Sequence, residues 1–87
     1  MSALTVRYFA ALREQMGLER ESVAVPAAGV TLVDLLSLLG ECHGEVAVEA
    51  LVGQGVRIAV NDELMDAPPG LLLPGDTVAF LPPVTGG

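Results

Sequence analysis

The stretch Thr77-Val78-Ala79-Phe80-Leu81 decides the fold of this chain. It is a mainly apolar run of strand length, preceded by the turn sequence Pro74-Gly75-Asp76 and followed by Pro82-Pro83. A strand in the middle of a sheet that is covered by other elements is rich in apolar residues. We therefore expect residues 77–81 to form a buried, central strand.

Working outward from this strand, four earlier segments show strand patterns. Residues 4–9, 20–25 and 56–60 alternate in hydropathy, and residues 63–65 form a brief extended piece. The first two segments are close in sequence, which predicts an antiparallel hairpin. Its connection carries a short helix over residues 10–16, rich in helix formers and ended by Gly17.

The main helix is predicted to run from Thr31 to Gly40. Thr31 can cap the first turn, and Asp34 three residues later completes a capping-box pattern. Leucines spaced at i, i+3, i+4 and i+7 form one buried face: Leu32, Leu35, Leu36 and Leu39. A second short helix is expected over residues 45–51, with Val46 and Ala50 turned inward.

This order of elements predicts an α+β domain over residues 1–81. We expect one mixed sheet of about five strands with the main helix packed on one face. A last strand that runs parallel to the first in the middle of the sheet would make the domain a β-grasp, the ubiquitin-like fold. Residues 82–87 are expected to form a flexible tail that ends in Gly-Gly.

Composition excludes several classes of function. The net charge is −7, lysine is absent, and the only basic residues are four arginines (Arg7, Arg13, Arg20, Arg57). Nucleic-acid binding needs a basic footprint, so we expect none. An acidic balance favours attraction to a basic partner surface. Without an apolar run long enough to span a bilayer, or a signal-peptide pattern, the expected location is the cytoplasm and not a membrane.

No metal site is expected in this chain. Cys42 is its single cysteine, which excludes an internal disulfide and a metal-binding cysteine pair. We interpret Cys42 and His43 as part of a loop flanked by glycines, without a catalytic or metal-binding role.

The end of the chain, Leu81-Pro82-Pro83-Val84-Thr85-Gly86-Gly87, has the composition of a directed tail. The prolines fix φ and the glycines carry no Cβ. Fully extended, the tail would reach roughly 20 Å, enough to place its carboxylate in another protein's pocket.

Four segments together resemble a known family: Val6-Arg7-Tyr8-Phe9-Ala10-Ala11-Leu12-Arg13-Glu14, Ala59-Val60-Asn61, Leu73-Pro74-Gly75-Asp76-Thr77-Val78-Ala79-Phe80, and the tail itself. They resemble, in the same order and over essentially the whole chain, the small subunit of molybdopterin synthase. That family is also called MoaD, a ubiquitin-like sulfur carrier.

The resemblance implies a mechanism centred on the terminus. A ubiquitin-activator-like adenylyltransferase would use ATP to turn the Gly87 carboxylate into an acyl-adenylate, and a sulfur donor would convert it to a thiocarboxylate. The sulfur would then pass to cyclic pyranopterin monophosphate to form the molybdopterin dithiolene. Gly86 would let the tail enter a narrow tunnel. ATP is consumed by the partner, no cofactor is bound, and the chain acts as a protein cosubstrate instead of supplying catalytic groups.

The resemblance also implies a docking surface for the large catalytic subunit, in a heterotetramer of two small and two large subunits. It places Phe9, Leu64 and Leu81 on this surface, and the strand pattern independently leaves Phe9 on the face opposite Val6. Ordinary sheet packing is the alternative for Leu64 and Leu81. Arg13 would fix the tail or the partner, or be a solvated helix charge.

Two other functions stay open. The chain would have the same chemistry as a sulfur carrier for thiazole synthesis or tRNA thiolation. It would also fit a ubiquitin-like protein modifier, although the absence of lysine excludes lysine-linked chains of itself.

Overall fold

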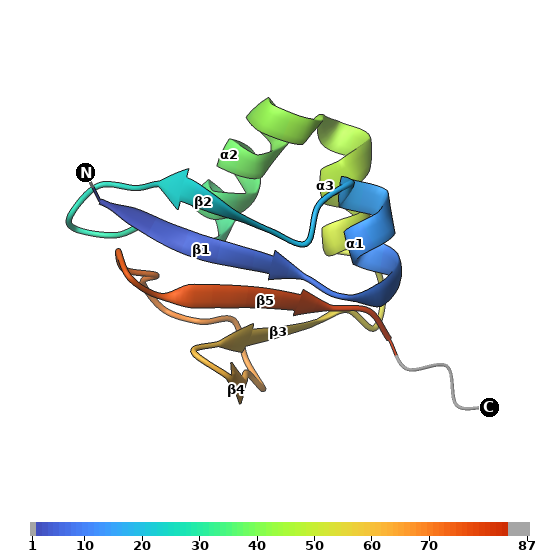
Figure 1. Cartoon of the computed structure of the whole chain (residues 1–87). Coiled ribbons are helices and arrows are strands. Elements are labelled where there is room, and N and C mark those ends of the chain that lie inside the picture. The colour runs from blue at the N-terminus through green and yellow to red at the C-terminus, as the bar shows by residue number, and fades with distance from the viewer. Residues whose placement is uncertain (1, 84–87) are drawn as a thin grey trace.

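The computed structural model describes residues 2–83. Five strands and three helices follow one another through this range, and Figure 1 shows the helices grouped on one side of the sheet. In chain order the elements are β1 (Ala3–Tyr8), α1 (Ala10–Met16), β2 (Arg20–Ala24), α2 (Leu32–His43), α3 (Glu45–Leu51), β3 (Arg57–Val60), β4 (Glu63–Leu64) and β5 (Thr77–Leu81).

The sheet is mixed, with the strand order β2-β1-β5-β3-β4. The first and last strands lie side by side and parallel, from the pair Thr5↔Thr77 to the pair Tyr8↔Phe80. All other pairs are antiparallel, including the hairpin of β1 and β2 that carries α1 in its connection. The expected central strand and β-grasp arrangement are confirmed.

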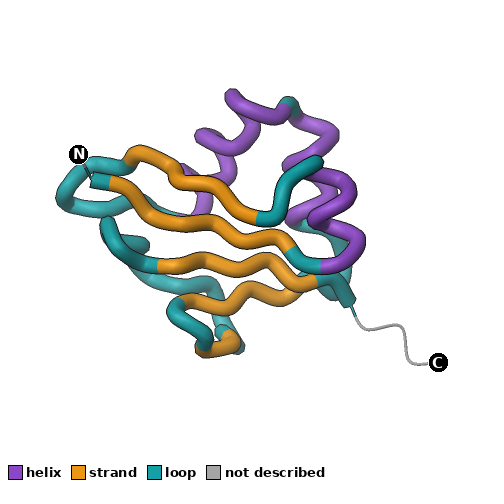
Figure 2. Tube along the Cα trace, in the orientation of Figure 1, coloured by secondary structure: helices purple, strands orange, loops and turns teal. Residues whose placement is uncertain are grey.

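The core lies between this sheet and the helices. Every second residue of the two central strands points to it, and Val6, Val78 and Phe80 are 0 % exposed. They pack in one cluster with buried side chains of α2 and α3. Figure 2 shows the helices lying over one side of the strands. The Tyr8 and Phe80 rings, on neighbouring parallel strands, stack with centroids 6.1 Å apart. Burying each such side chain contributes about 1.5–3 kcal/mol, so the sheet and helices stabilise each other.

The main helix begins as predicted and ends later. The Thr31 hydroxyl accepts a hydrogen bond from the Asp34 amide, and the Asp34 carboxylate accepts one from the Thr31 amide. The expected end at Gly40 is wrong, because α2 continues to His43 and Gly44 ends it with a φ of 91°. A glycine inside a helix costs only about 1 kcal/mol. Gly40 also faces Val48 of α3. A Cβ built on residue 40 would lie 3.5 Å from a methyl carbon of Val48.

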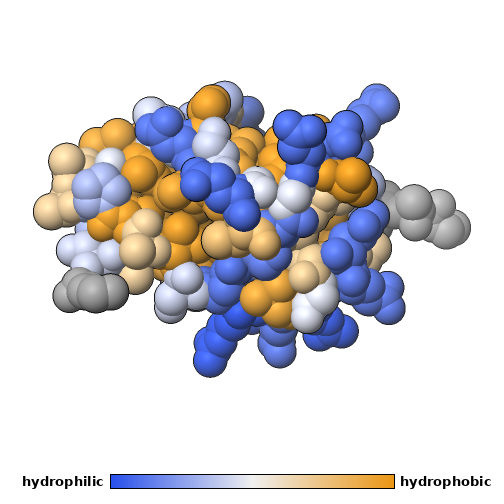
Figure 3. Space-filling model, turned by 90° about the horizontal axis from the view of Figure 1, so that it is seen from above, coloured by the Kyte–Doolittle hydropathy of each residue, from blue (hydrophilic) through white to orange (hydrophobic). Residues whose placement is uncertain are grey.

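The short helix over residues 45–51 is confirmed, but one of its predicted inward residues is wrong. Val46 is 78 % exposed, whereas Leu51 is 1 % exposed and Ala47, Val48 and Ala50 pack against the core. The helix is therefore rotated relative to the prediction. Seen from above, apolar side chains remain at the surface among polar ones (Figure 3). Across residues 2–83, no helix combines the length and apolarity that a bilayer crossing requires.

Candidate functional site: the open face of the sheet

The face of the sheet that points away from the core carries a row of side chains across four strands. The register sets Arg7 of β1 beside Ala79 of β5, Ala79 beside Ala59 of β3, and Ala59 beside Leu64 of β4. Side chains opposite one another in neighbouring strands point to the same face. Two small alanines between two long side chains leave the middle of this face hollow.

Phe9, Leu64 and Leu81 come together around this hollow. All three line a space of about 210 Å³ that also contacts Arg7 and Ala79. The same three residues line a second, adjoining hollow that continues to the start of the tail at Pro82 and Pro83. We call these three residues the apolar triad.

The apolar triad is separate from the core. Leu64 is 52 % exposed, Phe9 and Leu81 are half-buried, and none of the three belongs to the core cluster. Packing between sheet and helices therefore does not account for these side chains. Their role as a docking surface stays a prediction. Arg13 is exposed on α1 and lines neither hollow.

A tight turn between β3 and β4 positions Leu64. Asn61 and Asp62 both have positive φ, 51° and 70°, as two-residue hairpin turns require. The Asn61 side chain accepts a hydrogen bond from the Thr77 amide at 2.9 Å and donates one to Asp76 at 3.1 Å. Hydrogen bonds from the Leu73 amide and from Asn61 hold the pKa of the Asp76 carboxyl below its usual value. This network ties the β4 turn to the start of β5.

The tail leaves the sheet against Gly55. This glycine has a φ of 86°, and a Cβ built on it would lie 2.7 Å from Cβ of Pro83. Only glycine satisfies both the backbone conformation and the close approach. This contact was not predicted from the sequence. A glycine that follows a helix is expected to end the helix, and the sequence pattern does not show which distant residue it will meet. Gly86 and Gly87 lie outside the described residues.

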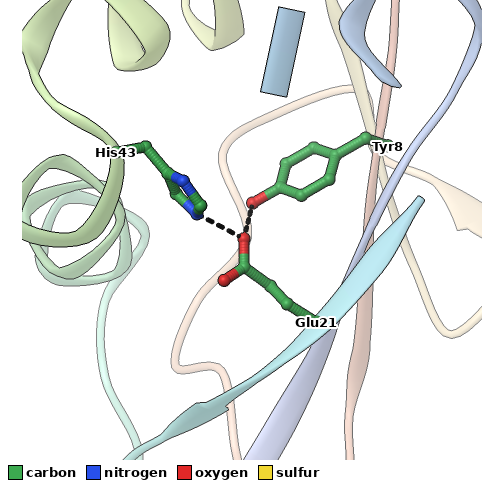
Figure 4. A network of polar contacts seen from close by, with 3 residues as sticks. All are labelled: Tyr8, Glu21 and His43. Carbon is green, nitrogen blue, oxygen red and sulfur yellow. Dashed lines mark hydrogen bonds and ion pairs between the residues drawn. The ribbon is translucent and has the colours of Figure 1, made fainter. Parts of the chain in front are cut away.

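A polar cluster lies on the other face, where the helices pack (Figure 4). The Tyr8 hydroxyl donates a hydrogen bond to Oε2 of Glu21 at 2.7 Å, and His43 Nε2 contacts the same oxygen at 2.7 Å. Burial, followed by the hydrogen bond to Glu21, raises the pKa of Tyr8 well above its ordinary value. The three residues come from β1, β2 and α2, so the cluster fastens the main helix to the sheet.

This cluster corrects the prediction for the Cys42-His43 pair. Both residues belong to the last turn of α2 and not to a loop, and Cys42 is exposed. Within residues 2–83, no three His, Cys, Asp or Glu side chains are placed to hold a metal ion. No local pattern indicates that His43 would meet Glu21, because the two residues are 22 positions apart in the chain.

Comparison with known families gives one match that spans nearly all of the chain. The sequence model described as the ThiS family matches residues 6–87. No curated protein matches the chain.

Solved structures of similar proteins cover almost the whole chain. SAMP1 from Haloferax volcanii is 28% identical with a TM-score of 0.77, covering 98% of this chain and 99% of that one. A putative molybdopterin converting factor subunit 1 from Pyrococcus furiosus is 31% identical with a TM-score of 0.75, covering 97% and 100%. Subunit 1 of the molybdopterin-converting factor from Helicobacter pylori, solved in complex with subunit 2, is 28% identical with a TM-score of 0.66, covering 98% and 99%.

Proposed function

The chain belongs to the ThiS family of ubiquitin-like sulfur carriers, and on this premise we propose that it is the sulfur carrier subunit of a molybdopterin synthase. Its large partner would be the catalytic subunit, which binds the apolar triad and receives the tail. The Gly87 carboxylate would carry the sulfur as a thiocarboxylate and deliver it to cyclic pyranopterin monophosphate.

One observation carries this proposal. Phe9, Leu64 and Leu81 gather beside Pro82 and Pro83, where the chain leaves the end of the central strand β5. This proposal is also supported by a similar protein, subunit 1 from Helicobacter pylori, which was solved in complex with its subunit 2. A protein seated on the apolar triad would be next to Pro82 and Pro83. The close approach of Pro83 to Gly55 fixes the place where the chain leaves the sheet.

The chemistry needs activation because a carboxylate resists nucleophiles. An oxygen of the Gly87 carboxylate would attack the α-phosphate of ATP on the adenylating partner, with release of pyrophosphate. A sulfur nucleophile would then attack the acyl carbon and displace AMP, a far better leaving group than hydroxide. With a persulfide donor, this attack would give an acyl disulfide. A thiol would then attack the donor's sulfur, the S–S bond to the acyl sulfur would break, and the thiocarboxylate would remain on Gly87 while the donor leaves as a disulfide with that thiol. The chain would supply the reacting terminus and the docking surface, and its partners the catalytic groups.

Sulfur loading is tested by intact mass. The chain is incubated with an adenylating protein, ATP and a sulfur donor, and we expect one terminal oxygen to be replaced by sulfur. A chain without Gly87 is the control. Loading is then followed by incubation with a molybdopterin synthase large subunit and cyclic pyranopterin monophosphate. A chain that loads sulfur but forms no dithiolene would contradict the molybdopterin assignment and leave the carrier assignment intact.

A second candidate function is protein modification. It is favoured by the similarity to SAMP1 of Haloferax volcanii, which is a small archaeal modifier protein. The Gly87 carboxylate would then form isopeptide bonds with lysines of other proteins. Tryptic peptides that carry the remnant of the tail on lysine, absent with the chain that lacks Gly87, would support this function.

A further inference from the structure

Arg7 is the one charged residue of β1, and it lies on the open face of the sheet. Its guanidinium carbon is 4.8 Å from the centre of the Phe9 ring, a cation–π geometry. Its side chain lines the hollow of about 210 Å³ together with the apolar triad. The strand and the ring therefore hold the guanidinium at the margin of the predicted docking surface.

The charge of Arg7 is not neutralised within residues 2–83. Its Nε atom is buried and has no hydrogen-bond partner among them. The two ion pairs found there join His43 to Glu21 and Arg57 to Asp66, so Asp62, which lines the same hollow, does not pair with Arg7. Directly opposite Arg7 on β2 lies a second cation, Arg20. Like charges in opposite positions of two strands repel each other.

A protein that docks on the apolar triad would change the surroundings of this cation. It would expel water from the hollow, and a cation that loses its hydration without an anionic partner opposes binding. A planar guanidinium fixed against a ring is arranged for two parallel hydrogen bonds to a carboxylate. A partner with only apolar side chains at this position would be disfavoured.

We propose that Arg7 is a specificity residue of the docking surface, and that it binds an Asp or Glu carboxylate of the protein that covers Phe9, Leu64 and Leu81. This inference rests on the proposed function, because it needs a protein docked on that face. The partner surface would thus combine an apolar centre with a carboxylate beside it. The net charge of −7 by itself indicates the opposite, a basic partner.

The test is the dissociation constant of the full chain for the large subunit and for the adenylating protein, measured by calorimetry at several salt concentrations. The variants are Arg7→Ala, Arg7→Lys and the matched control Arg20→Ala. Arg20 has the same charge on the same face, but it lines neither hollow next to the apolar triad. Urea unfolding checks the fold of each variant. Arg7→Gln, which keeps a long stem against Phe9, is used if the alanine variant does not unfold cooperatively.

For at least one of the two proteins, we expect Arg7→Ala to weaken binding about tenfold or more and to make it less dependent on salt. Arg7→Lys should recover only part of the loss because an ammonium lacks the planar fork. Arg20→Ala should stay within about twofold of the unchanged chain. Two outcomes would overturn the inference, provided that the unchanged chain binds and loads sulfur. One is an equal loss of affinity for Arg7→Ala and Arg20→Ala, and the other is no loss of affinity for Arg7→Ala with either protein. An unchanged chain that binds neither protein would contradict the proposed function as well.

Discussion

Glu21 joins three elements through a single carboxylate oxygen. Oε2 of Glu21 accepts the hydrogen bond of Tyr8 and contacts His43, and these side chains belong to β2, β1 and α2. Replacing Tyr8 by phenylalanine keeps the ring that stacks on Phe80 and removes only the hydroxyl. We expect Tyr8→Phe to lower the free energy of unfolding at neutral pH by about 1 kcal/mol, measured by urea denaturation.

The same variant also tests the raised pKa of Tyr8. Because the folded state holds the phenol proton more tightly than the unfolded chain, the stabilisation is complete below the ordinary tyrosine pKa of about 10 and is lost as the pH rises above it. The unchanged chain should therefore lose stability above about pH 10 more steeply than Tyr8→Phe. Tyr8 is the only tyrosine and the chain has no tryptophan, so tyrosinate absorbance follows this group alone. A stability difference between the two chains that stays constant into alkaline pH would contradict the prediction.

Gly55 allows a matched glycine comparison. Gly55→Ala places a side chain at a φ of 86° and against Pro83, whereas Gly53 has no positive φ and the nearest atom to its built Cβ is 3.4 Å away. We expect Gly55→Ala to cost about 1 kcal/mol or more in the free energy of unfolding, and to slow sulfur loading by displacing the start of the tail. Gly53→Ala should have a smaller effect on both. Thermal unfolding and the intact-mass assay measure the two effects, and equal behaviour of the two variants would contradict the role given to Gly55.

At the scale of elements, the two-residue strand β4 contributes one exposed leucine to the apolar triad. Leu64→Asp should leave the fold intact, because Leu64 is 52 % exposed, and should weaken binding to the large subunit by about tenfold or more. Leu71→Asp is the control, since Leu71 is exposed to a similar degree, 57 %, and lines neither hollow. Calorimetric titration of both variants separates a docking role from a general effect of exposed apolar area. Similar affinities would mean that Leu64 does not contact the partner.

The elements also show what the sequence could and could not predict. Alternation along residues 4–9 put Val6 and Phe9 on opposite faces because a strand has a strict period of two, and Val6 lies in the core while Phe9 does not. The apolar run of residues 77–81 indicated a buried strand but not that Val78 and Phe80 are the residues of it that face the core. The helix that begins at Thr31 was predictable from its capping box, a purely local signal. The continuation through Gly40 was not, because a glycine can lie inside a helix as well as end one, and the residue that ends α2 is Gly44, with a φ of 91°.

The candidate site was predictable to a similar extent. Its three apolar residues were anticipated through resemblance and, for Phe9, through strand parity. The structure adds that they surround one hollow. Gly55, the stacking of Arg7 on Phe9 and the meeting of Glu21 with His43 were missed because each depends on tertiary geometry.

At the scale of the molecule, charge is unevenly distributed. Three of the four arginines, Arg7, Arg20 and Arg57, lie on the open face of the sheet by their register. Residues 31–52, which include α2 and α3, contain four carboxylates and no lysine or arginine. The helices α2 and α3 therefore carry carboxylates without arginines, whereas the open face combines three arginines with Asp62, which lines the hollow. Net charge describes solubility and long-range attraction of such a chain better than it describes the contact itself.

The proposed reactive end and the stability of the domain should be separable. Among the described residues, the buried core cluster runs from Leu4 to Phe80, and Gly87 follows it seven positions later in the chain. We expect deletion of Gly87 to abolish sulfur loading in the intact-mass assay and to change the melting temperature little. Val84→Ala, which shortens one tail side chain and keeps both glycines, is the control. A large drop in melting temperature on deletion would mean that the terminus stabilises the domain.

The central pairing of β1 with β5 also determines what a truncated chain can still do. Because β5 is bonded on both sides, by β1 and by β3, a chain cut before Thr77 loses the middle of its sheet and not an edge. Such a fragment would not keep the side chains of β1 and β3 in register, and so would not present Phe9 beside Leu64. Truncation within the domain would thus destroy the docking surface together with the tail. A fragment truncated in this way would therefore not compete with the intact, sulfur-loaded chain for its partner proteins.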